Sequence, residues 1–377
     1  MRIHPLLRRH LALVAGAAAF AVVPLAAQTA VPTGASLPAG ASGPSPTPAS
    51  LADGGAAAEF DYRAADSVAL TSPEAAATSV ETLARDLTRG LHTDREKIRA
   101  IYRWVTQNIA YDVEGMHSIA RVMNQDPGTV LQRRRTLCDG YSFLVGSLAR
   151  MAGMEAEFVE GKAKGLGVDD GEMGGNHSWV AVKVDGEWRL IDATWGAGDI
   201  IDGRFVRRFR DFFFLVPPEK LIWTHFPRDP RWQLLEAPVT AAQFRAQPMP
   251  QRDFFELGFD AAAVRATAAS RRFHGFVGVF PVAEHRIRLV DGPLAKDLSP
   301  DSSYAVALDA PGATEATIVS AGAWIPMPRT GDRFAARFTP APGSGPVVMV
   351  RYPGDAQPRV ILAYAPVPTP EEARRSR

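Results

Sequence analysis

The single cysteine, Cys138, is the feature that most constrains how this 377-residue chain can fold. One cysteine excludes an internal disulfide bond, a cysteine-based zinc finger and an iron–sulfur cluster. The chain must therefore fold around a hydrophobic core, and its 46% hydrophobic residues are ordinary for a globular protein. Its 42 Lys and Arg residues nearly balance 41 Asp and Glu residues, so bulk charge gives no reason to expect a nucleic-acid partner.

The N-terminus has the layout of a secretory signal peptide. Basic residues, among them Arg8 and Arg9, precede an uninterrupted apolar run from Leu11 to Val23, and small residues suited to cleavage follow. The run spans about 20 Å as a helix, short of a bilayer core of about 30 Å. An uncleaved anchor extended through Leu25 is the alternative, but Pro24 interrupts it. We expect residues 1–27 to be removed, leaving a periplasmic or secreted protein without stable membrane insertion.

Composition and periodicity divide the remaining chain. Residues 28–58 contain mostly Ala, Pro, Ser, Gly and Thr, which cannot bury enough apolar surface to fold, so a disordered linker is predicted. Helical and then strand patterns follow, and beyond them short β-like runs separated by turn residues suggest an immunoglobulin-like β-sandwich. The predicted parts are an α+β domain at 59–238, a connecting segment at 239–272, the sandwich at 273–366 and a tail at 367–377.

Three helices are predicted in the α+β domain. Ser72-Pro73-Glu74 is typical of a helix start, and Gly90 of its stop. Thr93 and Glu96 form a capping box before an apolar stripe at helical spacing. A third helix is predicted from Cys138 to Met151, ended by Gly153.

A β-hairpin is the strongest strand signal. Asp185-Gly186 separates the β-rich runs Ser178–Val184 and Glu187–Asp192, after a first run at Glu155–Gly161. In the sandwich region the predicted runs are Phe276–Phe280, Arg286–Val290, Tyr304–Leu308, Thr314–Val319, Arg333–Phe338, Val347–Arg351 and Val360–Tyr364.

One constellation in the sequence can perform chemistry: Cys138, His177 and Asp192. Cys138 begins a predicted helix after three arginines, and both a helix N-terminus and nearby cations stabilise a thiolate. If Asp185-Gly186 is the hairpin loop, Val184 faces Glu187, and this register puts His177 and Asp192 diagonally adjacent on one sheet face. An imidazole there can accept the thiol proton and donate to the carboxylate, as in a catalytic triad.

Each of these residues also has a purely structural interpretation. Cys138 can be a small buried apolar residue, His177 a strand histidine hydrated by water, and Asp192 a strand-end residue bonded to the next turn. A register slip of one residue would put His177 and Asp192 on opposite faces. The three types together, in an exported chain that has kept one free thiol, favour catalysis.

These segments resemble the transglutaminase-like superfamily. The three motifs that resemble it are Leu137 to Tyr141, Asn176 to Val182 and Trp188 to Gly196. The segment Phe212 to Pro218, followed by His225-Phe226-Pro227 and Asp229-Pro230, looks like the kyphoscoliosis peptidase branch. The resemblance covers about residues 93–259.

The resemblance implies a papain-like core with helices packed on an antiparallel sheet. By motif, Cys138 matches the nucleophile, His177 the base and Asp192 the residue that orients it. Acyl transfer through a thioester to water or to an amine is implied, with a protein or peptide substrate. Thr136 stands where a glycine is common, which implies a changed approach to the nucleophile. Nothing resembles the calcium sites of the animal cross-linking enzymes, which argues against true cross-linking.

Other candidate residues are weaker. Gln132 has the spacing of a papain-type oxyanion donor, but a solvated loop residue is the simpler interpretation. The acidic loop between Gly165 and Gly175 could be a lid or a weak cation site, although a solvated connection is favoured. The histidines lack a His-Glu-x-x-His spacing, so no metal and no other cofactor is expected.

The sequence therefore predicts an exported cysteine peptidase or amidase. A transferase with an amine acceptor is the first alternative. A non-catalytic envelope adaptor that keeps the fold is the second. The chemistry of Cys138, His177 and Asp192 favours an enzyme over the adaptor.

Overall fold

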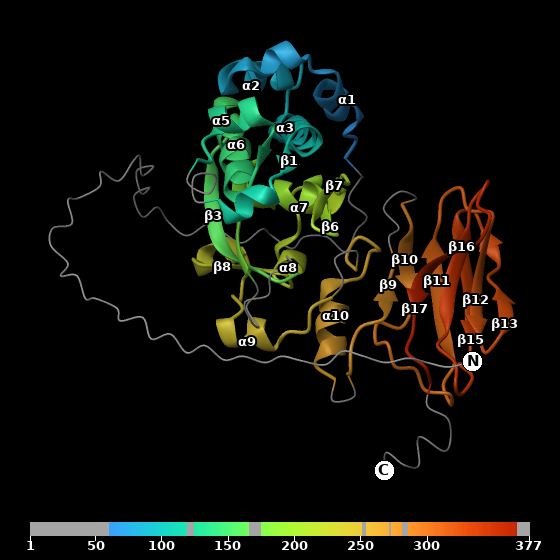
Figure 1. The fold of residues 1–377 in the computed structure, drawn as a ribbon. Coiled ribbons are helices and arrows are strands. Elements are labelled where there is room, and N and C mark those ends of the chain that lie inside the picture. The colour runs from blue at the N-terminus through green and yellow to red at the C-terminus, as the bar shows by residue number, and fades with distance from the viewer. Residues whose placement is uncertain are drawn as a thin grey trace, which may run out of the picture. The chain divides into compact units, whose positions relative to one another are not determined.

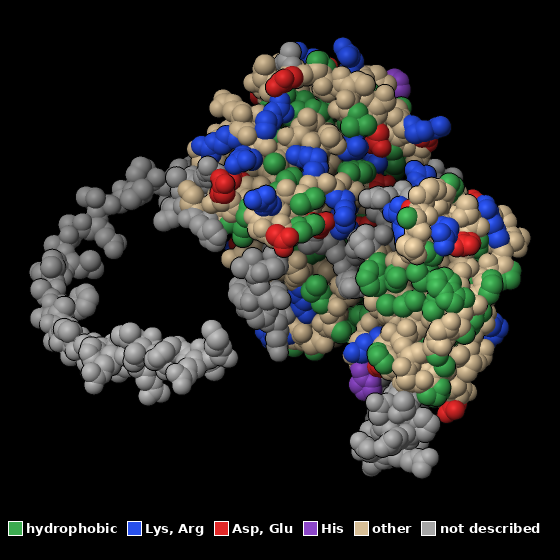
Figure 2. All heavy atoms as spheres, turned by 45° about the vertical axis from the view of Figure 1, so that its right-hand side comes forward, with side chains coloured by type: hydrophobic (Ala, Val, Ile, Leu, Met, Phe, Trp, Pro, Cys, Tyr) green, Lys and Arg blue, Asp and Glu red, His purple; other side chains and the backbone are tan. Residues whose placement is uncertain are grey.

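The computed structural model describes residues 60–118, 124–165, 175–250, 254–270, 273–280 and 286–367 (Figure 1). The predicted signal peptide, the linker at 28–58 and residues 368–377 of the tail lie outside the described residues. Within the described part of the chain, no helix is long and apolar enough to cross a membrane. On the face shown in Figure 2, Lys and Arg side chains are interspersed with Asp and Glu.

Within the described residues, five α-helices precede the main sheet in the chain. They are α1 (Arg63–Thr71), α2 (Val80–Thr88), α3 (Asp94–Asn108), α5 (Pro127–Arg133) and α6 (Cys138–Met151). The capping box of Thr93 and Glu96 begins α3, and α6 has the bounds that the sequence predicts. The single helix expected before Gly90 is divided into a short 3-10 helix, Glu74–Thr78, and α2. The division falls at Ser79, which is extended and accepts a hydrogen bond from the Thr82 amide as the N-cap of α2.

A four-stranded antiparallel sheet follows, in the order β5-β4-β3-β8. Its strands are β3 (Ala156–Ala163), β4 (Gly175–Val184), β5 (Glu187–Ile191) and β8 (His225–Pro227). Helix α6 contacts both β3 and β4. Buried residues of these helices and strands form one hydrophobic cluster, with Tyr102, Tyr141 and Trp179 among its largest side chains. The expected α+β core is therefore present, with its nucleophile candidate on the helix and its base candidate on the sheet.

Two strands end differently from the prediction. Strand β3 continues past Gly161 to Ala163 because its last three residues also pair with β8. Strand β5 ends at Ile191, because Asp192 caps the next helix, α7 (Ala193–Ala197).

Short elements surround this sheet. They are β1 (Ala110–Tyr111), β2 (Arg135–Thr136), β6 (Gly198–Ile201), β7 (Arg204–Arg207) and α8 (Pro218–Leu221). Strands β1 and β2 pair in parallel, and β6 and β7 form a hairpin. The segment predicted as a connection at 239–272 contains the helices α9 (Ala241–Ala246) and α10 (Ala261–Ala268).

The C-terminal region contains two antiparallel sheets, with strand orders β10-β11-β15-β14 and β13-β12-β16-β17-β9. Each of the seven predicted runs overlaps a strand, whereas the short strands β13 and β14 were not expected. The strands are β9 (Gly278–Val279), β10 (Arg288–Asp291), β11 (Tyr304–Asp309), β12 (Glu315–Ser320), β13 (Ala323–Pro326), β14 (Arg329–Thr330), β15 (Arg333–Phe338), β16 (Val347–Arg351) and β17 (Arg359–Ala363). An immunoglobulin-like arrangement of this region remains a prediction.

Candidate active site

Cys138 is the first residue of α6, and its side chain is partly exposed. The segment before it is held by Gln125, whose Oε1 accepts hydrogen bonds from the Thr136 hydroxyl at 2.5 Å and the Leu137 amide at 3.1 Å. Gly140 leaves room for this contact, since a Cβ there would lie 1.8 Å from Thr136 Oγ1. Gln125 therefore holds both the Thr136 side chain and the Leu137 backbone directly before the thiol.

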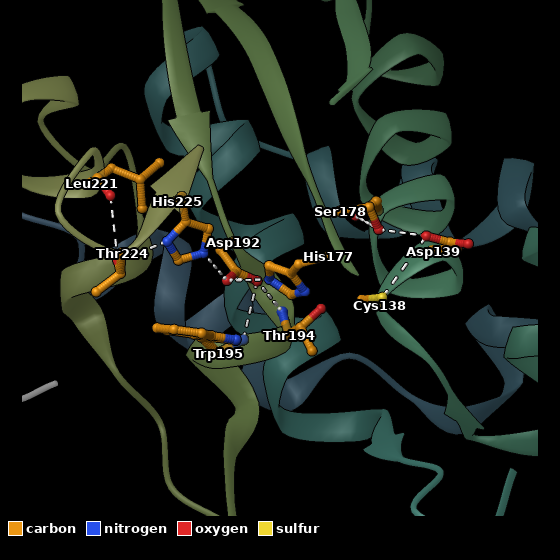
Figure 3. Close-up of polar contacts among 11 residues, drawn as sticks. Cys138, Asp139, His177, Ser178, Asp192, Thr194, Trp195, Leu221, Thr224 and His225 are labelled. Carbon is orange, nitrogen blue, oxygen red and sulfur yellow. Dashed lines mark hydrogen bonds and ion pairs between the residues drawn. The ribbon is translucent and has the colours of Figure 1, made fainter. Parts of the chain in front are cut away.

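The β4–β5 hairpin positions His177 and Asp192. Asp185 and Gly186 both have positive φ angles, 53° and 84°, as a two-residue hairpin turn requires. The register is the predicted one, since Val184 faces Glu187. His177 Nε2 lies 2.9 Å from Asp192 Oδ2, and both side chains are buried (Figure 3). The structure thus brings together the two residues that the hairpin argument placed on one face.

Asp192 is bonded through both carboxylate oxygens. Oδ1 accepts hydrogen bonds from the backbone amides of Thr194 at 2.9 Å and Trp195 at 3.1 Å, which begin α7. Oδ2 faces two imidazoles, the Nε2 of His177 and the Nε2 of His225, the latter at 3.0 Å. The carboxylate is therefore fixed by helix and sheet together.

The charges of His177 and Asp192 stabilise each other. Burial alone lowers the pKa of His177, but the negative charge of Asp192 and its hydrogen bond outweigh this effect, and the thiol of Cys138 adds to it, raising the pKa to about 10. Burial alone raises the pKa of Asp192, yet the charge of His177 and the bonds from both imidazoles hold this pKa well below its usual range. An imidazolium at His177, beside the sulfur of Cys138, is therefore favoured at neutral pH.

The thiol lies beside a small polar network. The imidazole of His177 lies between Asp192 and Cys138 (Figure 3). Asp139 Oδ1 accepts a hydrogen bond from Ser178 Oγ at 2.7 Å and lies 3.8 Å from Cys138 Sγ. Because Ser178 follows His177 on β4 and Asp139 follows Cys138 on α6, this bond links the two elements that carry the thiol and the imidazole.

The arginines before Cys138 are engaged elsewhere in part. The guanidinium of Arg134 lies over the Trp104 ring at 5.0 Å, and Arg135 pairs with Asp112 and Glu114 at 3.9 and 3.7 Å. The positive charge of Arg135 is partly neutralised by these two carboxylates, which weakens its field at the thiol. The helix N-terminus and His177 are the nearer sources of positive potential.

His225 is the residue of the site that sequence reasoning missed as a functional group. It begins β8 and is fully buried, and its Nδ1 lies 2.8 Å from the hydroxyl of Thr224. The only signal for it was its place in the segment that resembles the kyphoscoliosis peptidase branch.

The weaker candidates have other surroundings. Gln132 lies exposed in α5 rather than in a loop. The buried rings of Trp179 and Trp195, which were not among these candidates, lie beside the His177 ring, with centroids 6.0 and 5.7 Å away. Residues 166–174 of the acidic loop lie outside the described residues.

Among the described residues, His177, Asp192 and His225 bring one potential metal-binding atom each within 4.8 Å of one another. Both imidazole nitrogens, however, lie at hydrogen-bond distance from the same carboxylate oxygen. Each Nε2 is thereby engaged by Asp192. The two contacts form a hydrogen-bond network centred on Asp192 Oδ2.

Part of the chain is similar to known proteins. Residues 81–193 match the model of the transglutaminase-like superfamily, which confirms the resemblance to it. Its resemblance to the kyphoscoliosis peptidase branch is also confirmed: the chain is 34% identical to kyphoscoliosis peptidase of Homo sapiens over 192 residues, 50% of this chain and 29% of that protein.

Two further likenesses extend over different shares of the chain. The Lim and transglutaminase domain protein ltd-1 of Caenorhabditis elegans is 28% identical over 56% of this chain and 31% of its own length. The structure of red sea bream transglutaminase is 11% identical, with a TM-score of 0.28 over 81% of this chain and 58% of that chain. The chain spans less than a third of the length of kyphoscoliosis peptidase and of ltd-1.

Proposed function

We propose that the chain is an exported cysteine acyl-transfer enzyme in which Cys138, His177 and Asp192 form a catalytic triad. It hydrolyses an amide bond of a protein or peptide in the periplasm or outside the cell. The observation that carries the proposal is the buried bond of 2.9 Å between His177 and Asp192, beside a partly exposed thiol at a helix N-terminus.

The geometry supports the following acylation step. His177 Nε2 is engaged by Asp192, which leaves Nδ1 to hold the proton from Cys138. The thiolate sulfur attacks the substrate carbonyl carbon, and the π electron pair moves to oxygen. Backbone N–H groups of the first turn of α6 have no carbonyl partner within the helix and can donate to this oxyanion. The C–N bond then breaks, His177 protonates the leaving amine, and a thioester on Cys138 remains.

Deacylation uses the same groups in reverse. His177 takes a proton from water, whose oxygen attacks the thioester, and the sulfur leaves as the thiolate. An amine in place of water would give transfer. We favour hydrolysis, because nothing in the sequence resembles the calcium sites of the cross-linking enzymes.

The experiment is to incubate the folded protein with a library of peptides and to identify new termini by mass spectrometry. The wild type is expected to produce termini that the Cys138→Ala variant does not. A primary amine with a fluorescent label is added in a second reaction, and its incorporation would show transfer. Identical product sets from the wild type and from folded Cys138→Ala would contradict the enzyme and favour the adaptor.

A further inference from the structure

His225 occupies a place in the site that the triad alone does not explain. Its side chain is completely buried, and it comes from β8, a strand that pairs with β3 and not with β4 or β5. Its Nε2 lies 3.0 Å from Asp192 Oδ2, the oxygen that also faces His177. One carboxylate oxygen therefore serves two imidazoles.

We propose that His225 is a positioning residue that holds Asp192 oriented toward His177. The inference rests on the proposed function and goes beyond the triad. Two backbone amides of α7 hold Oδ1, but they leave the carboxylate free to tilt about them. A second donor on Oδ2, fixed in the sheet, removes that freedom. The His177 imidazole is then kept where its other nitrogen meets Cys138.

The hydroxyl of Thr224 sets the tautomer of His225. Thr224 Oγ1 lies 2.8 Å from His225 Nδ1 and 3.3 Å from the carbonyl oxygen of Leu221. When the hydroxyl donates to Nδ1 across the shorter contact, the ring proton is on Nε2 and points at Asp192. His225 then donates a hydrogen bond through Nε2 to Asp192 Oδ2.

The surroundings of His225 allow its packing to be separated from its hydrogen bond. Its ring makes edge contacts with Trp195 and Trp179, with centroids 4.6 and 5.1 Å apart. Phenylalanine would keep an aromatic ring among these side chains but would donate nothing to Asp192. A purely structural role predicts that His225→Phe leaves the chemistry intact, whereas a positioning role predicts a loss.

The test measures the alkylation of Cys138 by iodoacetamide as a function of pH. Because the chain has one cysteine, the reaction reports on this thiol alone. An ordinary thiol reacts as it ionises near pH 8.5, whereas a thiol paired with an imidazolium reacts at much lower pH. The proteins compared are the wild type, His225→Phe, His225→Gln, and His177→Ala as the reference without the base.

We expect Cys138 to be alkylated at least tenfold more slowly in His225→Phe than in the wild type at neutral pH. The pH profile of alkylation should move toward that of His177→Ala. His225→Gln, whose amide can donate to Asp192, should recover a large part of the rate. A His225→Phe profile that matches the wild type, or a His225→Gln loss as large as that of His225→Phe, would overturn the proposal.

Circular dichroism and thermal melting show which variants fold. If His225→Phe does not fold, Thr224→Val replaces it, because this change keeps the imidazole and removes only the hydroxyl that sets its tautomer. A smaller loss in the same direction is expected, and an unchanged profile would overturn the proposal. The proposed function is tested separately by the wild type. It would be contradicted if Cys138 in the folded wild type were alkylated with the same pH profile as in the denatured chain.

Discussion

Asp192 Oδ2 lies 2.9 Å from His177 Nε2, although Asp192 has already left the strand that pairs with the strand of His177. The last paired residues of β4 and β5 are Val180 and Ile191. Asp192 turns there to cap α7, so its backbone belongs to a helix start while its side chain stays on the face that the strand register gave it. The hairpin sets the face, and the cap sets the orientation of the carboxylate.

The charge of Asp192 is expected to control catalysis. Asp192→Asn keeps the size of the side chain but removes the charge that holds the pKa of His177 high against burial. The amide can also favour the wrong tautomer of the imidazole, and the rate should fall by about 10²–10⁴-fold. The peptide-library assay measures the loss, and a variant with wild-type activity would contradict the role given to Asp192.

The same pair predicts how stability depends on pH. Burial opposes the ionised form of Asp192, but its partners lower its pKa below the unfolded value, so it stabilises the fold above about pH 4 and less as the pH falls. Burial opposes the charged form of His177 too, but Asp192 raises its pKa from 6.5 to about 10. This contribution is present below pH 6.5 and is lost as the pH rises toward 10.

Urea unfolding across the pH range measures both effects. In Asp192→Asn the free energy of unfolding should depend less on pH than in the wild type on the acid side. In His177→Gln it should depend less on pH on the alkaline side. Parallel curves for wild type and variants would show that the pair does not titrate as described.

Space at the start of α6 is a further condition for the site. In Gly140→Ala the new Cβ would lie 1.8 Å from Thr136 Oγ1 and 2.7 Å from Gln125 Oε1. The crowding should cost about 1–3 kcal/mol of unfolding free energy and displace the backbone before Cys138, slowing its alkylation. Gly146→Ala in the same helix is the matched control, because its new Cβ would lie 3.6 Å from the nearest atom, on Arg150. Equal effects of the two substitutions would contradict this account.

The link between α6 and β4 should also matter for the thiol. Ser178→Ala removes the hydroxyl that donates to Asp139 at 2.7 Å. The Asp139 carboxylate then accepts a stronger hydrogen bond from the Cys138 thiol, 3.8 Å away, and this bond holds the proton on the sulfur. A hydrogen bond to a charged group contributes about 1.5–3 kcal/mol, so alkylation of Cys138 should slow by about tenfold or more. Ser142→Ala removes only the weaker contact to Ser178 at 3.4 Å and should have little effect. An alkylation rate in Ser178→Ala equal to that of Ser142→Ala would contradict this role.

Local signals made much of the site predictable. Asp185-Gly186 defines a two-residue turn, and the register that follows from it is the observed one. The extent of α6 follows from its apolar stripe, and its end follows from Gly153. These features depend on neighbours in the sequence, which is why a single chain carries enough information about them.

The parts that could not be predicted depend on contacts between distant segments. His225 reaches Asp192 because three residues of β8 pair with the end of β3, and such a short strand has no alternating pattern to reveal it. Gln125 precedes α5 in the chain and bonds to Thr136, which follows that helix. The break at Ser79 was hidden because the segments before and after it, Glu74–Thr78 and Val80–Thr88, are also compatible with one continuous helix.

The most direct test of the central claim is to trap an acyl group on Cys138. p-Nitrophenyl acetate serves as the acyl donor, and intact-mass and peptide mapping after an acid quench locate the adduct. The account predicts rapid acetylation of Cys138 in the folded wild type, followed by discharge to water, with both steps slowed by orders of magnitude in His177→Ala. Acetylation no faster than in the denatured chain, or equally fast in folded His177→Ala, would contradict it.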